Sequence, residues 1–88
     1  MVSARRGLTG LHTEENRKLM VALTEARHAA GLSQYQLADR LSVDQSYVSK
    51  YESCRRRLDV IEFLRVVAAI GVKADAILAQ LPPVKPSA

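Results

Sequence analysis

Apolar residues recur along this chain at helical spacing, in short segments separated by polar or glycine-containing breaks. The first segment begins at Thr13 and ends before Gly31, a residue suited to terminating a helix. Leu32 follows the break and is expected to pack back under this helix. The predicted buried stripe has residues three or four positions apart, with Met20 alongside: Leu19, Leu23, Ala26 and Ala30.

Two shorter segments follow, at 33–41 and 44–52, and each has one narrow apolar stripe. Small Ala38 on the first would let the second helix approach closely. Two short helices joined by a tight turn predict a helix-turn-helix. The stripes consist of Leu37 and Leu41 in the first segment and Val48 and Tyr51 in the second.

The boundaries of these two helices agree with this interpretation. Ser33 and Gln36 have the spacing of a capping box at the start of the first helix. Asp44 is placed to cap the second helix. The break between them is Ser42-Val43-Asp44, from which Val43 can turn inward.

Two more helices are expected, at about 59–70 and 74–81. Asp59 lies near the start of the first, and Gly71 follows its end. Pro82 and Pro83 would stop the last helix. The 59–70 helix is apolar on more than one face, so it is either central in the core or shared between the core and a partner surface.

These elements predict an all-α fold of five helices, in one domain. We divide the chain into a flexible basic arm at 1–12, a helix-turn-helix domain at 13–81 and a disordered tail at 82–88. The arm either adds phosphate contacts along DNA or is a frayed terminus without a role.

Composition narrows the class of protein. The chain has 88 residues, 48% of them apolar and 5% aromatic, and a formal net charge of +4, which suits a polyanionic partner. A single cysteine excludes an internal disulfide and favours a reducing cytosol. No signal peptide or membrane span is evident. The expected location is therefore cytoplasmic.

The outward face of the helix at about 45–52 is polar and lacks acidic residues. Hydroxyl, amide and ammonium groups of this kind contact base edges and phosphates. The residues concerned are Gln45, Ser46, Ser49 and Lys50.

The run GLSQYQLADRLSVDQSYVSKYE, with the later RRLDVIEFLRVVAAIGV, resembles the Cro and phage-repressor (XRE) family of DNA-binding domains. The resemblance extends from about Leu19 to Leu81 and implies a compact lambda-repressor-like fold. Ser42 and Cys54 stand where the family commonly has glycine. A left-handed backbone at either position would be strained by roughly 1 kcal/mol.

Resemblance and chemistry together suggest roles for individual side chains. Gln45 can contact adenine N6 and N7, and Gln34 resembles the family glutamine that holds a phosphate while bracing residue 45. The resemblance also suggests a partly buried ion pair between Arg27 and Glu52. Lys50 would reach either guanine or a phosphate. Ser46 and Ser49 would meet bases or backbone, and Tyr47 either packs beside the backbone or meets a thymine methyl.

Three consecutive cations, Arg55, Arg56 and Arg57, follow the 44–52 helix. A charge run is usually a solvated loop, but this one leaves the helix beside the DNA backbone. We expect at least one of the three to contact a phosphate or the minor groove.

The expected partner is double-stranded DNA, bound by a homodimer on an inverted repeat, with the recognition helix at about 45–52 in the major groove. The dimer would form through the 59–70 helix, the last helix and the loop between them. The expected function is a sequence-specific transcriptional regulator, most simply a repressor. The alternative is an antitoxin or adaptor of the same fold whose main partner is a protein.

Enzyme chemistry finds little support in the sequence. The two histidines, His12 and His28, lie far apart, and neither belongs to a ligand pattern with Cys54. No phosphate-binding glycine motif or nucleophile motif is present. We therefore expect no catalytic residues, no metal and no cofactor.

Overall fold

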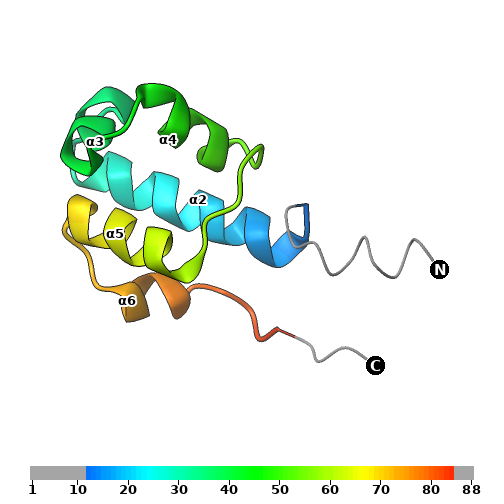
Figure 1. Cartoon of the computed structure of the whole chain (residues 1–88). Coiled ribbons are helices and arrows are strands. Elements are labelled where there is room, and N and C mark those ends of the chain that lie inside the picture. Colours follow the sequence, from blue (N-terminus) through cyan, green and yellow to red (C-terminus); the bar gives the residue numbers. More distant parts are fainter. Residues whose placement is uncertain (1–11, 85–88) are drawn as a thin grey trace.

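The computed structural model describes residues 12–84, which form five helices and no strand. They are α2 (Glu14–Ala29), α3 (Gln34–Leu41), α4 (Gln45–Glu52), α5 (Val60–Ile70) and α6 (Ala74–Leu78). In Figure 1, α3 and α4 lie on one side of α2, and α5 and α6 lie on the other. This all-α arrangement, with the helix-turn-helix as the second and third helices, confirms the predicted fold class. Most of the expected arm and the end of the expected tail lie outside the described residues.

Side-chain caps fix where three helices begin. The Thr13 hydroxyl accepts a hydrogen bond from the Asn16 amide at the start of α2. The predicted capping box of α3 is present: the Ser33 hydroxyl accepts from the Gln36 amide, and the Gln36 side chain accepts from the Ser33 amide. A second capping box, between Asp59 and Glu62, begins α5. Such caps satisfy amide groups that have no partner inside the helix.

Two expected helix ends are corrected. Asp44 has the extended backbone of an N-cap, but its side chain makes no capping hydrogen bond. Its carboxylate can therefore favour the start of α4 only through its charge. The last helix ends at Leu78 and not at Leu81, because its final residues tighten into turns in which the Gln80 and Leu81 amides donate to Ile77 and Leu78.

The core lies where the five helices meet, with Ile77 contributed by α6, and aliphatic side chains dominate it. The predicted stripes of α3 and α4 are buried or packed against the core, and Leu32 packs back under α2 as expected. Ala30 is a correction: it is exposed because it forms the C-cap of α2, where the chain leaves the helix. The largest fully buried side chains are Tyr51, Met20, Leu23, Leu37, Ile77, Val48 and Val66.

Both turns that flank α4 contain a left-handed residue other than glycine. Ser42 has φ 58° and ψ 43° at the C-cap of α3, and Cys54 has φ 60° after α4. Both positions were expected to be strained if left-handed, and both are left-handed. They turn the chain sharply enough to place α4 across α3 and to return it towards α5.

Candidate nucleic-acid interface

The helix α4 has one buried and one open side. Val48 and Tyr51 are fully buried against the core, which fixes the rotation of the helix. Ser46 and Lys50 are exposed on the opposite side, and Gln45 and Ser49 are partly exposed. Because the buried side holds the helix, the polar side forms a ridge on the surface.

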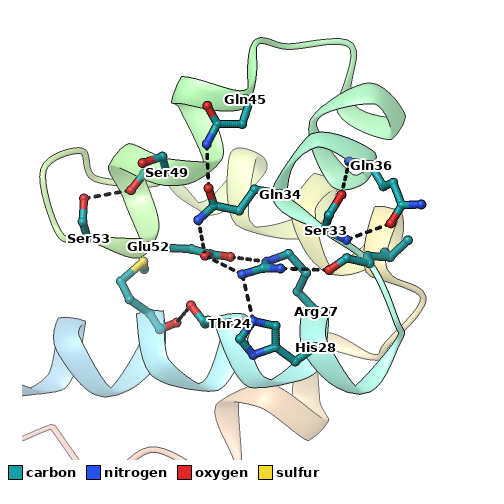
Figure 2. A network of polar contacts seen from close by, with 12 residues as sticks. Thr24, Arg27, His28, Ser33, Gln34, Gln36, Gln45, Ser49, Glu52 and Ser53 are labelled. Atoms are coloured by element: carbon teal, nitrogen blue, oxygen red, sulfur yellow. Dashed lines mark hydrogen bonds and ion pairs between the residues drawn. The ribbon is translucent and has the colours of Figure 1, made fainter.

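A relay of hydrogen bonds runs from this ridge into the protein. Gln45 Nε2 donates to Gln34 Oε1 at 2.6 Å, and Gln34 Nε2 donates to Glu52 Oε1 at 2.9 Å. Glu52 in turn accepts two hydrogen bonds from Arg27, at 2.7 Å from Nε and 3.0 Å from Nη2. Figure 2 shows these four side chains in line between α4 and α2. The structure thus connects Gln34 and Gln45 to the ion pair between Arg27 and Glu52, which the family resemblance suggested.

The inner end of this relay is nearly closed to solvent. The Arg27 and Glu52 side chains are each 7% exposed. Arg27 Nη1 also donates to the Leu32 carbonyl at 2.8 Å, and its Nη2 lies 3.2 Å from His28 Nε2. The hydrogen bond to Glu52 raises the pKa of Arg27, so the guanidinium stays charged. Two short, charge-assisted hydrogen bonds in a buried site make this a rigid anchor.

The three arginines after α4 differ in their exposure and in their contacts. Arg55 is exposed, and its Nε donates to the Ser53 hydroxyl at 2.9 Å. Arg56 is partly buried: its guanidinium lies 4.3 Å from the centre of the Tyr47 ring and donates to Glu62 Oε2 at 2.8 Å. Arg57 is exposed. The stacking on Tyr47 is a cation–π contact, so Arg56 is held on both sides.

Glu62 serves two partners at once. Its Oε1 accepts from the Asp59 amide, which closes the capping box of α5, while its Oε2 accepts from Arg56. These two hydrogen bonds, that from Arg56 first, lower the pKa of Glu62 to about 2. Sequence reasoning missed this role of Glu62, although the spacing of Asp59 and Glu62 is that of a capping box and would have indicated half of it.

A hollow of about 540 Å³ lies between the ridge and the loop after α4. Cationic and hydroxyl groups line much of it, which suits an anionic ligand. Its lining residues are Val43, Asp44, Ser46, Tyr47, Lys50, Arg55 and Arg56. The hollow therefore joins Ser46 and Lys50 of the ridge to Arg55 and Arg56 of the loop after α4.

Comparison with known proteins agrees with this helix-turn-helix geometry. A family model described as helix-turn-helix matches residues 23–77. An XRE-family like protein from Pseudomonas syringae pv. tomato str. DC3000 has a solved structure that is 44% identical, with a TM-score of 0.75, over 83% of this chain and 89% of that one. The chain belongs to the XRE family of helix-turn-helix proteins. No curated protein matches it.

Membership of the XRE family confirms the resemblance and supports a DNA-binding regulatory role. The family fold is regulatory and not typically enzymatic. Within residues 12–84, no His, Cys, Asp and Glu side chains are grouped as a metal site would need. Among the same residues, no helix combines the length and the apolar character needed to cross a bilayer.

Proposed function

We propose that this chain is a sequence-specific, double-stranded DNA-binding transcriptional regulator that inserts α4 into the major groove. The observation that carries the proposal is the relay, which holds Gln45 at the start of α4 while its outer side remains accessible. An amide fixed in this way has lost its side-chain freedom before it meets DNA, so binding costs less entropy. Gln45 would then contact adenine through N6 and N7.

The neighbouring residues divide into base and backbone contacts. Ser46, Ser49 and Lys50 project from the same ridge and would meet bases or phosphates, with Lys50 directed to either guanine or a phosphate. Gln34 would hold a phosphate beside Gln45. Tyr47 packs beside the backbone in this proposal, because Arg56 covers its ring.

The loop after α4, which contains Arg55, Arg56 and Arg57, would lie along the DNA backbone. Phosphate contacts from Arg55, Arg56 and Arg57 would position the protein without reading sequence. Arg55 is the strongest candidate of the three, because it is exposed and lines the hollow beside Lys50.

The regulator would act as a homodimer on an inverted repeat, most simply as a repressor that covers a promoter. The outer side of α5 has three exposed large apolar residues on one face: Val60, Ile61 and Leu64, which are 70%, 58% and 44% exposed. An apolar face of this kind is typical of an interface. A twofold axis there would set two α4 helices about 34 Å apart, in successive major grooves. The same face is what an antitoxin or adaptor would offer to a foreign protein.

Selection of bound duplexes from a random pool tests the proposal. The wild-type chain should enrich an inverted repeat, and Gln45→Ala should lose the preference at one base pair of each half-site while keeping the rest. A wild-type chain that enriches no sequence would contradict the proposed function. An unchanged profile for Gln45→Ala would remove Gln45 as the base reader.

A further inference from the structure

The relay beneath Gln45 has a direction that its chemistry imposes. A carboxylate only accepts hydrogen bonds, so Gln34 must turn its Nε2 towards Glu52, at 2.9 Å. The Gln34 oxygen then faces the other way, towards Gln45. Since that oxygen is also only an acceptor, Gln45 must present its own Nε2, at 2.6 Å.

The outermost amide is therefore left with one orientation. Figure 2 shows the Gln45 nitrogen directed at Gln34 and its oxygen on the far side. Towards a ligand, Gln45 offers that oxygen as an acceptor and the second N–H of Nε2 as a donor. Adenine presents a donor at N6 and an acceptor at N7 in the major groove, whereas guanine presents acceptors at both O6 and N7.

We propose that Glu52, which lies beneath the DNA-facing ridge, determines base specificity by fixing the polarity of the Gln45 amide. An unbraced glutamine could turn its amide over and meet guanine with its N–H groups. In this chain that rotation would set the Gln45 oxygen against the Gln34 oxygen. Turning Gln34 as well would set its oxygen against the Glu52 carboxylate. Either state replaces a hydrogen bond by a repulsive contact between two acceptors.

The buried ion pair makes this constraint strong. Arg27 holds Glu52 through Nε and Nη2 and is itself held by the Leu32 carbonyl, so the carboxylate cannot rotate away from Gln34. The side chains of both partners are only 7% exposed, so little water is available to substitute for the lost hydrogen bonds. The inference rests on the proposed function, because it concerns how Gln45 reads a base.

Two variants distinguish control of the Gln45 amide orientation by Glu52 from a merely structural role of Glu52. Glu52→Gln replaces the pure acceptor by an amide that can donate or accept, which lets the relay run in either direction but removes one of the two hydrogen bonds from Arg27. Gln34→Lys keeps the ion pair and replaces the relay amide by a pure donor, so Gln45 must turn its oxygen inward and its N–H groups outward. Glu25→Gln, at an exposed position of α2, is the matched control, since all three substitutions raise the net charge by one.

The experiment measures relative affinity for duplexes with adenine or guanine at the position where Gln45→Ala loses its preference. The wild-type chain and Glu25→Gln should prefer adenine by roughly 10-fold or more. Glu52→Gln should bring the two bases to within about threefold, and Gln34→Lys should reverse the order towards guanine. Circular dichroism melting of each variant shows whether the fold is retained. Gln34→Lys leaves the ion pair between Arg27 and Glu52 in place, so a changed base preference in this variant does not come from loss of that pair.

The result that overturns the inference is distinct from the result that overturns the proposed function. If Gln45→Ala abolishes the preference but Glu52→Gln and Gln34→Lys both retain the wild-type ratio, the polarity relay is wrong and base reading by Gln45 stands. If the wild-type chain has no preference at any position, the proposed function fails first. Weaker binding to both bases with an unchanged ratio counts against the inference, because a structural role alone would produce it.

Discussion

Arg27 on α2 and Glu52 at the end of α4 are joined by a bidentate ion pair, with Arg27 Nε 2.7 Å from Glu52 Oε2 and Nη2 3.0 Å from Oε1. The pair is nearly closed to water, and it also anchors Gln34. It therefore ties α2 to the end of α4 and holds Gln34, the residue that contacts Gln45 on the polar ridge.

Removing one partner of this pair should destabilise the whole domain. Arg27→Ala leaves the Glu52 carboxylate buried without its cation, so the free energy of unfolding should fall by about 3–5 kcal/mol. For a domain of this size the melting temperature should drop by at least about 12 °C. Arg17→Ala, at an exposed position of the same helix, is the control and should stay within about 0.5 kcal/mol of wild type. A melting temperature for Arg27→Ala within a degree of wild type would show that the Arg27–Glu52 pair is not needed for the stability of the fold.

The exposed face of α5 should govern assembly. Leu64→Glu places a charge at the centre of that face, so self-association should weaken at least 10-fold, by about 1.4 kcal/mol or more, without loss of folding. Val21→Glu, at a 55% exposed apolar position of α2, is the matched control and should remain dimeric. Sedimentation of each protein, alone and on operator DNA, gives the stoichiometry. Wild-type monomers under both conditions would refute the dimer, and a stoichiometric foreign protein in the native complex would favour the adaptor.

The salt dependence of DNA binding should distinguish the arginines. Arg55→Gln should flatten the slope of log K against log salt by about 1 per subunit, for specific and random duplexes alike. Arg56→Gln should flatten it less, because Glu62 already neutralises Arg56. Fluorescence anisotropy at several salt concentrations measures both slopes. Equal slopes for wild type and Arg55→Gln would show that Arg55 contacts no phosphate.

The left-handed turn before α4 offers a stabilising substitution. Ser42→Gly should raise the free energy of unfolding by about 0.5–1 kcal/mol, since glycine adopts φ 58° without the steric cost that serine bears. Ser53→Gly is the contrast: its φ is −94°, and its hydroxyl donates to the Ser49 carbonyl. That change should destabilise by a similar amount. Urea denaturation compares the two variants, and a loss of stability in Ser42→Gly would mean that the serine side chain contributes more than the strain costs.

The acid stability of the domain should depend on Glu62. Its pKa in the folded chain is lowered to about 2 from an ordinary value of 4.5, so it stabilises the fold above pH 4.5 and loses that contribution as the pH falls towards 2. Both partners are partly open to solvent, which limits the contribution to roughly 1 kcal/mol. The stability difference between wild type and Glu62→Gln should therefore shrink from pH 6 to pH 2.5. Urea denaturation at each pH measures it, with Glu25→Gln as the control, and a constant difference would contradict the assignment.

Much of this fold follows from local patterns in the sequence. The period of Leu37, Leu41, Val48 and Tyr51 and the S-x-x-Q box depend on residues within a few positions of each other, and all of them lie as expected. Helix ends were less predictable. Ala30 keeps helical spacing but is exposed at a C-cap, and Leu81 is apolar but lies in a turn.

The candidate site divides in the same way. The polar side of α4 could be predicted because its residues share one helix face. The stacking of Arg56 on Tyr47 and the double use of Glu62 depend on how a loop folds back, which no periodic pattern encodes. The resemblance supplied the distant pair Arg27 and Glu52; spacing alone could not have done so.

The shared carboxylate of Glu62 restricts how the connection between α4 and α5 can evolve. Surface loops ordinarily accept insertions and deletions. Here one oxygen is committed to the first turn of α5 and the other to Arg56, six residues earlier. A residue added between them would have to break one of the two contacts. Relatives that keep both should therefore keep the number of residues between these positions, and length variation should be found elsewhere in the chain.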